Sequence, residues 1–254
     1  MMYAYIYIYF VLTVFGLAIG SFCNVVIHRL PKGDFPGKAR SACPECTHTL
    51  SVADLIPIFG YVRNKGKCRY CGARINPRYP LVEAAVAVFA ALCFLRFGLD
   101  IRTAFTFACC AVLICITLID METMTIPDSF HIIFALLGVW ACFINGLMPV
   151  ERAIGLFAVS LPMFLIAFAV KGAFGGGDIK LMAVCGFLLG WKGILLAFFA
   201  ALILGGSAAV YLLIFKRSGR GSKMPFGPYL CAGIATALFY GEEIINFYLS
   251  LYAF

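Results

Sequence analysis

The most constraining feature of this sequence is a series of long apolar segments that few charged residues interrupt. The first 27 residues carry no charged side chain, and comparable segments recur as far as the C-terminus. Hydrophobic residues make up 63% of the 254 residues and charged residues only 13%, whereas a soluble globular chain has about 25% charged residues. A water-soluble fold cannot bury so much apolar surface. The composition therefore indicates a polytopic membrane protein and excludes a collagen, a disordered tail, a secreted miniprotein and a cytosolic enzyme.

Apolar segments of about 20 residues indicate transmembrane helices, and their continuity argues against the alternating pattern of a β-barrel. We predict an all-α helical bundle of about eight spans, at residues 4–27, 80–97, 103–120, 129–147, 153–171, 179–191, 193–215 and 228–251. The predicted domains are a first span at 1–27, a cytoplasmic four-cysteine loop domain at 28–79 and a transmembrane core at 80–254.

The positive charges predict the orientation, because cytoplasmic loops hold an excess of Lys and Arg. Eight spans with the N-terminus outside place sixteen of the 20 Lys and Arg in the cytoplasm. Ten lie between Arg29 and Arg78, and a second basic patch contains Lys216, Arg217, Arg220 and Lys223. In this chain, basic residues follow the first apolar segment. In a secretory signal peptide, basic residues precede the apolar segment. We expect a retained first span, contact with membrane lipid and no nucleic-acid partner.

Four of the 12 cysteines form two Cys-x-x-Cys turns in the basic segment, Cys43 with Cys46 and Cys68 with Cys71. The spacing of the turns is close to that of zinc ribbons, in which each turn supplies two thiolates to a tetrahedral ion. The loop has too little apolar surface to fold without such an ion. We predict a structural zinc site, because four thiolates leave no open position for substrate or water.

Two disulfides are the alternative for these four cysteines. Disulfides persist in oxidising compartments, which conflicts with the cytoplasmic position predicted from the charges. The other eight cysteines lie within apolar spans, where cysteine packs as a small hydrophobic residue.

Two aspartates lie where an apolar span meets the membrane surface. Asp120 ends one span, and Asp178 follows three glycines directly before another. An ionisable residue at membrane depth is costly and is by default a functional candidate. Both aspartates lie at the cytoplasmic ends of their predicted helices, so they can meet although they are distant in the sequence.

Two neighbouring carboxyl groups share a proton, since both cannot ionise easily. One can then activate water while the other protonates a peptide carbonyl, as in aspartic proteases. Helix capping is the alternative for Asp178 and for Asp128, which both stand near the start of a predicted helix. It is a poor explanation for Asp120, because a negative charge is unfavourable at a helix C-terminus.

Other hydrolytic motifs are absent from the sequence. It contains no His-Glu-x-x-His signature, no Gly-x-Ser-x-Gly elbow and no Walker phosphate loop. The aspartates are therefore the only evident hydrolytic pair.

Several segments, in order, resemble those of the type IV prepilin leader peptidases. Besides the two cysteine turns they are residues 20–31, 78–83, 120–128, 175–181 and 225–230. The resemblance implies an aspartic endopeptidase of the bacterial inner membrane that removes the basic leader of type IV prepilins and type II secretion pseudopilins. Cleavage would follow a glycine at the cytoplasmic face, and the catalytic aspartates would be Asp120 and Asp178.

The resemblance also implies a second reaction. Many members of this family methylate the new amino terminus with S-adenosylmethionine, and the four-cysteine loop accompanies that bifunctional form. The sequence contains no recognisable soluble fold for this cofactor, so it predicts no residues that bind it.

A transporter or ion pathway is the main rival, with Asp120 and Asp178 relaying protons or binding a cation. Such a protein would show inverted repeats and paired discontinuous helices, and we find no repeat in the sequence. A zinc-bearing membrane scaffold is a third reading, but it leaves the two aspartates unexplained.

Overall fold

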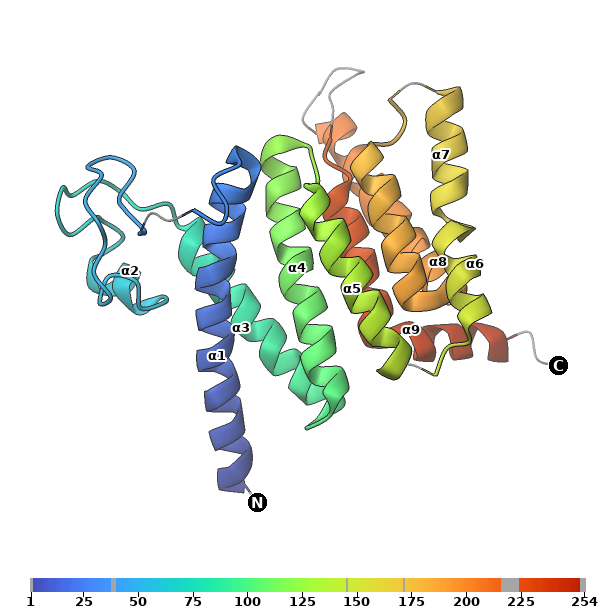
Figure 1. Cartoon of the computed structure of the whole chain (residues 1–254), viewed down its shortest axis with the longest axis horizontal. Helices are drawn as coiled ribbons and strands as arrows, with labels where there is room; N and C mark the ends of the chain where they lie inside the picture. The colour runs from blue at the N-terminus through green and yellow to red at the C-terminus, as the bar shows by residue number, and fades with distance from the viewer. Residues whose placement is uncertain (1, 38–39, 145, 171, 216–223, 252–254) are drawn as a thin grey trace. The chain divides into compact units, whose positions relative to one another are not determined.

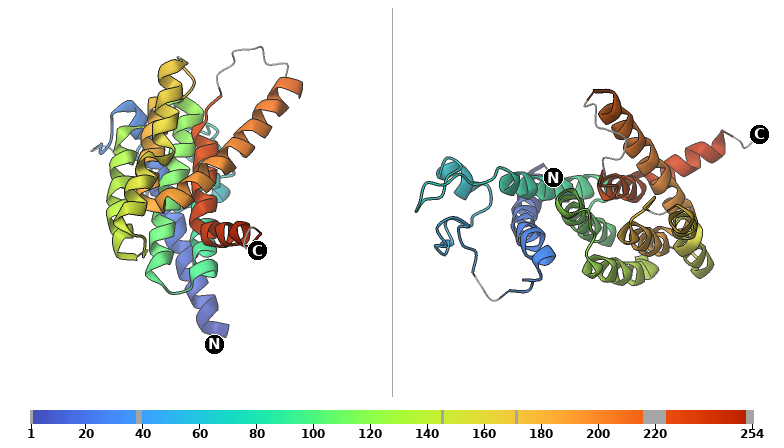
Figure 2. Two further views of the ribbon diagram at one scale, coloured as in Figure 1. Left: turned by 90° about the vertical axis from the view of Figure 1, so that its right-hand side faces the viewer. Right: turned by 90° about the horizontal axis from the view of Figure 1, so that it is seen from above.

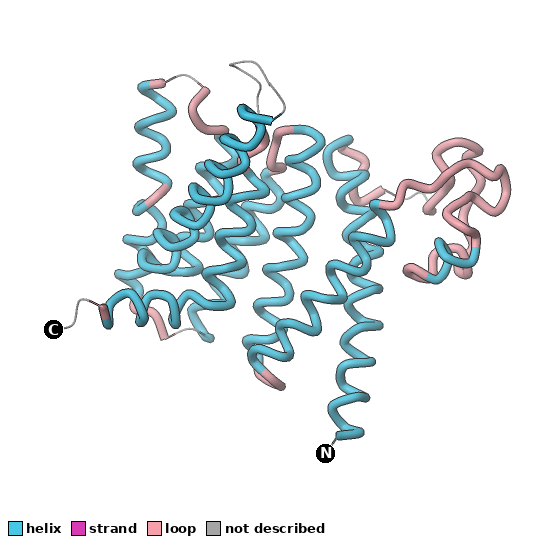
Figure 3. Tube along the Cα trace, turned by 180° about the vertical axis from the view of Figure 1, so that it is seen from behind, coloured by secondary structure: helices cyan, strands magenta, loops and turns pink. Residues whose placement is uncertain are grey.

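The computed structural model describes residues 2–37, 40–144, 146–170, 172–215 and 224–251. Among these residues it contains helices and loops but no β-strand (Figure 3), which confirms the all-α prediction. The second basic patch predicted from the sequence, Lys216 to Lys223, lies outside the described residues. The chain forms two compact units, Met1–Cys115 and Ile116–Phe254.

The first unit is built on a pair of long helices. These are α1 (Met2–Arg29) and α3 (Arg78–Phe97), which lie side by side (Figure 1). Gly16 and Gly20 are one turn apart on α1 and face the backbone of α3: a Cβ on either would lie within 2.7 Å of a Cα atom of that helix. Small residues at this spacing allow two helices to approach closely in a membrane.

A long loop joins these two helices and carries the four cysteines. We call residues 33–77 the cysteine loop. It follows η1 (Leu30–Lys32) and contains the short helix α2 (Phe59–Arg63). Figure 1 shows it beside the end of α1 and the start of α3. The helix α4 (Ile101–Thr123) begins in the first unit and ends in the second.

The second unit packs around one long helical segment. α8 (Gly176–Phe215) contacts α5 (Asp128–Ile144), α6 (Pro149–Ala158), α7 (Ser160–Ala169) and α9 (Gly227–Ser250). Glycines again set the closest approaches. A Cβ on Gly186 of α8 would overlap the carbonyl oxygen of Gly155 on α6, and a Cβ on Gly233 of α9 would overlap that of Ala197 on α8.

A buried arginine links three of these helices. Arg152, near the start of α6, donates from Nη2 to the carbonyl oxygen of Ala141 at 2.8 Å and from Nη1 to that of Phe187 at 3.2 Å. These acceptors lie on α5 and α8. A buried cation is costly unless it is hydrogen-bonded, so the contacts hold the three helices in one arrangement.

Five helical segments are long and apolar enough to cross a membrane, among the described residues. They are Tyr5–Lys32, Arg78–Phe97, Ile101–Thr123, Pro149–Ala169 and Gly176–Phe215, while α5 is apolar but shorter. The polytopic helical architecture is thus confirmed at the level of these five candidates. Of the finer prediction of about eight spans, α5 is shorter than a candidate span and α9 is not among the five candidates.

The sixth and seventh predicted spans, 179–191 and 193–215, correspond to the two parts of α8, which is interrupted at Gly190. This residue has φ 73° and ψ 172°, a conformation that glycine adopts without the clash of a Cβ. The two halves of α8 consequently run in different directions (Figure 2). The eighth predicted span is helical as α9, but its last part turns aside (Figure 1) and carries the exposed Glu242 and Glu243.

We expect Gly186→Ala to destabilise the second unit. The added Cβ would overlap the backbone of Gly155, and overpacking costs typically about 1–3 kcal/mol. The measurement is thermal unfolding of the purified protein in detergent. The matched control is Gly206→Ala on the same helix, where a Cβ would meet no atom within 4 Å. Equal Tm values for the two variants would contradict the close contact.

Candidate functional site

Asp120 lies in the last turn of α4 and is held by the start of another helix. Its side chain is 5% exposed. The backbone N–H of Gly227, the first residue of α9, donates to its Oδ2 at 3.0 Å. The first N–H groups of a helix have no partner within it, and the helix dipole there favours negative charge. The N-terminus of α9 therefore stabilises a carboxylate that the C-terminus of α4 disfavours.

This contact requires glycine at position 227. A Cβ on Gly227 would lie 2.6 Å from Oδ2 of Asp120 and 2.9 Å from its Cγ. Any other residue would push the carboxylate or the helix start away. The segment 225–230, singled out from the sequence, contains this glycine, but its contact with Asp120 was not predictable from that segment.

Asp178 lies near Asp120. It is half-buried in the first turn of α8. Its carboxyl group is close enough to that of Asp120 for the two charges to interact. The buried thiol of Cys231 lies one turn beyond Gly227 on α9. It is close enough to both carboxyl groups to interact with their charges. The structure thus brings together the two aspartates predicted from the sequence, and it adds Cys231, which the sequence suggested only as an apolar residue.

The segments that carry these residues also contact one another. The rings of Phe174, before the glycine run, and Phe226, before α9, have centroids 5.9 Å apart. A Cβ on Gly177 would lie 3.1 Å from Cβ of Ile126, in the connection between α4 and α5. The glycine run therefore lets the start of α8 lie directly against that connection.

His131 supports the same glycine run from α5. It is 7% exposed, and its Nε2 lies 3.0 Å from the carbonyl oxygen of Gly177. A carbonyl only accepts, so this nitrogen carries the proton. Its Nδ1 lies 3.3 Å from Oδ1 of Asp128. The sequence contains no His-Glu-x-x-His metal motif, and no role for this histidine was predictable from it.

Three other acidic residues, Asp128, Glu122 and Glu83, are not part of the aspartate pair. Asp128, for which capping was the alternative, accepts a hydrogen bond from Nζ of Lys180 at 2.7 Å and so links α5 to α8. Glu122 is exposed. Glu83 belongs to the first unit, where its Oε2 accepts from the backbone N–H of Ile58 at 2.7 Å.

The four thiols of the cysteine loop form one cluster. The Sγ atoms of Cys43, Cys46, Cys68 and Cys71 all lie within 4.8 Å of one another. Those of Cys43 and Cys71 are 3.9 Å apart, far beyond the S–S bond length of about 2.05 Å. Zinc–sulfur bonds of about 2.3 Å place tetrahedral sulfur atoms about 3.8 Å apart. The cluster therefore has dimensions that could hold a metal ion.

Both cysteine turns use the same backbone geometry. In the first turn, the N–H of Thr47 donates to the carbonyl of Cys43, and the N–H of Cys43 donates to the carbonyl of His48. In the second turn, the N–H of Gly72 donates to the carbonyl of Cys68, and the N–H of Cys68 donates to the carbonyl of Ala73. Thr47 and Gly72 both have positive φ angles, of 55° and 75°. The repeated turn explains how two segments distant in the sequence present their thiols alike.

The backbone also prepares one thiol to bind a cation. The N–H groups of Cys46 and Glu45 lower the pKa of Cys43 to about 7. The thiolate is the form that binds metals, so about half of this cysteine is in the ligand form at pH 7.

The sequence matches two protein families. The model of the Bacterial Peptidase A24 N-terminal domain matches residues 14–97, and that of the Type IV leader peptidase family matches residues 107–210. The first match contains the cysteine cluster, and the second contains Asp120 and Asp178.

Curated relatives are similar over almost the whole chain. A prepilin leader peptidase/N-methyltransferase of Bacillus subtilis (strain 168) is 35% identical over 242 residues, which are 95% of this chain and 98% of that protein. Proteins of the same name from Burkholderia pseudomallei (strain 1026b) and Aeromonas salmonicida (strain A449) are 32% and 30% identical. Those alignments cover 94% and 96% of this chain, and 86% and 95% of the two relatives. No solved structure matches.

We expect the purified protein to contain about one metal ion per chain, held by the four cysteines, since four thiolates complete one tetrahedral site. Cys68→Ser should lower the metal content several-fold. The measurement is elemental analysis of detergent-purified protein. Cys142→Ser removes an exposed thiol of α5 outside the cluster and should leave the metal content unchanged. Equal metal content in both variants would contradict the assignment.

Proposed function

Because this chain belongs to the type IV leader peptidase family, we propose that it is a membrane-embedded aspartic endopeptidase for type IV prepilins and pseudopilins. It removes their basic leader after a glycine and then methylates the new amino terminus. The observation that carries the peptidase assignment is the convergence of Asp120 and Asp178 at the ends of α4 and α8.

The two carboxyl groups divide the work of peptide hydrolysis. One, ionised, takes a proton from water as the water oxygen attacks the peptide carbonyl. The other, protonated, donates to the carbonyl oxygen as the tetrahedral intermediate forms. Transfer of a proton to the leaving nitrogen then breaks the C–N bond and releases the leader. The Gly227 N–H keeps Asp120 in a fixed position throughout.

The charge distribution supports a cytoplasmic active site. A leader that carries Lys or Arg remains on the cytoplasmic side by the rule that also orients this chain. We propose a bacterial inner-membrane protein with its N-terminus outside, in which the four-cysteine domain at residues 28–79 and both aspartates face the cytoplasm. The peptide bond then reaches Asp120 and Asp178 without crossing the bilayer.

We assign zinc to the thiol cluster. Four cysteine ligands at these separations suit a tetrahedral zinc ion. Its role is structural, because the four thiolates complete its coordination. The ion joins the two turns of a loop that has little core of its own.

The methylation uses S-adenosylmethionine. When bound, this cofactor offers a methyl group to the lone pair of the new amino terminus; the electrons of the broken C–S bond remain on sulfur, and the nitrogen releases one proton. The chain must therefore contain a site for a nucleoside with a cationic centre.

We expect Asp120→Asn and Asp178→Asn each to reduce cleavage by about a thousandfold or more, the order of loss when a member of a catalytic pair is removed. The substrate is a synthetic peptide with a basic leader, a glycine and an apolar helix. The control, Glu122→Gln, changes an exposed acid two residues from Asp120 and should retain wild-type activity. Wild-type cleavage by Asp178→Asn would exclude that residue from the mechanism.

Gly227→Ala should lower kcat by about a hundredfold, the cost of a catalytic group displaced by about 1 Å. Its Cβ would lie 2.6 Å from Oδ2 of Asp120, while the peptide-binding surface stays the same, so KM should change little. Steady-state kinetics on the same peptide measure both constants. An unchanged kcat would show that Asp120 does not depend on the start of α9.

A further inference from the structure

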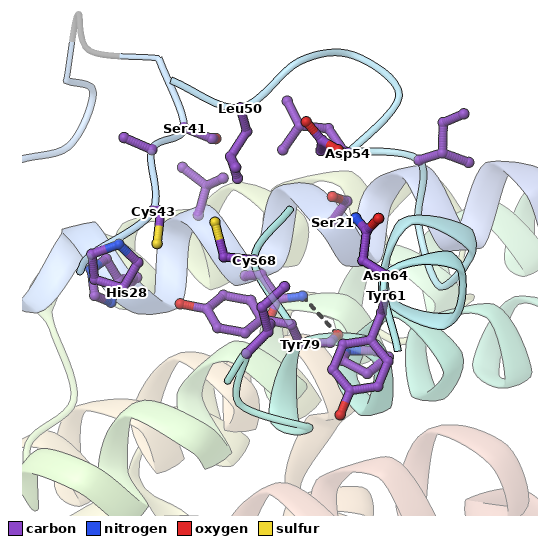
Figure 4. A pocket seen from close by; sticks show the side chains of 18 of the residues that line it. Ser21, His28, Ser41, Cys43, Leu50, Asp54, Tyr61, Asn64, Cys68 and Tyr79 are labelled. Atoms are coloured by element: carbon purple, nitrogen blue, oxygen red, sulfur yellow. Dashed lines mark hydrogen bonds between the residues drawn. The ribbon is translucent and has the colours of Figure 1, made fainter. Parts of the chain in front are cut away.

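The first unit contains a cavity of about 380 Å³ between α1, α3 and the cysteine loop (Figure 4). Pockets for small molecules typically have volumes of about 300–1,000 Å³. All of the residues that line it belong to the first unit. Neither member of the aspartate pair lines the cavity, and the proposed peptidase mechanism does not use it.

Polar residues form the helical side of this cavity. Ser21, Asn24 and His28 follow one face of α1, and Tyr79 and Glu83 lie one turn apart on α3. Both helices are otherwise apolar and are candidate membrane spans. Polar groups in such helices usually mark a functional site.

Asn24 offers an unused acceptor at the cavity. The residue is 4% exposed, and its Nδ2 donates to the carbonyl oxygen of Tyr79 at 3.0 Å (dashed in Figure 4). Its Oδ1 is buried and accepts no hydrogen bond. An unsatisfied buried acceptor costs free energy, which a ligand with an N–H donor would recover.

Glu83 adds a buried carboxylate to the same wall. It is 8% exposed, and one of its oxygens accepts from the backbone N–H of Ile58. A carboxylate can accept about four hydrogen bonds. Acidic side chains in nucleotide sites commonly accept from ribose hydroxyls, and Glu83 is suited to that contact.

The cysteine loop supplies aromatic and basic groups. Figure 4 shows the rings of Tyr61 and Tyr79 at the cavity, and Arg29 and Arg69 are among the residues that line it. Tyrosine rings provide stacking surface for a purine, and arginine pairs with a carboxylate.

We propose that this cavity binds S-adenosylmethionine. The adenine amino group donates to Oδ1 of Asn24, the ribose hydroxyls donate to Glu83, and the amino-acid carboxylate meets the arginines. The inference rests on the proposed methyltransferase function and gives it a location, in the unit that lacks the aspartate pair.

The test is equilibrium binding of radiolabelled S-adenosylmethionine to the metal-loaded, full-length protein in detergent, with S-adenosylhomocysteine as competitor. We expect Asn24→Leu and Glu83→Gln each to weaken binding at least tenfold. The matched control for Asn24→Leu is Asn246→Leu, the same exchange at an exposed position of α9, which should bind as the wild type does.

Leader cleavage is measured on the same preparations to distinguish the loss of the binding site from the loss of the fold. Both cavity variants should retain leader cleavage. Wild-type binding by both variants would overturn the location while leaving the methyltransferase function intact. No binding by the wild-type protein would overturn the methyltransferase function itself. If both variants lost binding and also lost cleavage, the result would count against the proposal, since it would indicate a general structural defect.

Discussion

The arrangement of the second unit depends on one contact, in which the first N–H of α9 meets the carboxylate at the end of α4. Asp120 is buried at a helix C-terminus, where its charge is unfavourable. The start of α9 supplies a donor and the positive end of a helix dipole. Gly227 is essential to this arrangement, because a Cβ would occupy the space of the carboxylate. A residue near the C-terminus thus holds the proposed catalytic residue Asp120, more than a hundred positions earlier.

The sequence alone predicted those features whose signal is local. Asp and Glu number only 12 in the chain, so Asp120 and Asp178 beside apolar spans were conspicuous, and the cysteine turns have a distinctive spacing. The contacts of Gly227 and His131 were not predictable, because they depend on the approach of distant segments. Glycine has no side chain that would indicate a partner, and nothing in the sequence shows which of the 25 glycines in the chain makes such a contact. The interruption of α8 was predictable to within two residues, because Lys192 separates the sixth and seventh predicted spans and Gly190 lies beside it.

The two units separate the chemistry of the chain. The aspartates and the glycine run belong to the second unit, and the thiol cluster and the cavity belong to the first. The two family matches fall on the same two parts. Each reaction can therefore have its own binding groups: an acid pair for hydrolysis, and uncharged, acidic and aromatic groups for a nucleoside. The acid pair would serve methyl transfer poorly, because that reaction needs no protonated carbonyl.

The cavity also explains why a structural metal would matter to an enzyme whose hydrolytic groups lie in another unit. Cys43 and Cys68 are both cluster ligands and part of the cavity wall. The loop that contains them has no strand and one short helix among its described residues, so a metal ion would add to the turns and hydrogen bonds that fix that wall. Ordering the loop in advance lowers the entropy that a ligand would otherwise lose on binding. A metal ion in the cluster would thus serve the proposed methyl transfer by shaping the site, without contacting the reacting atoms.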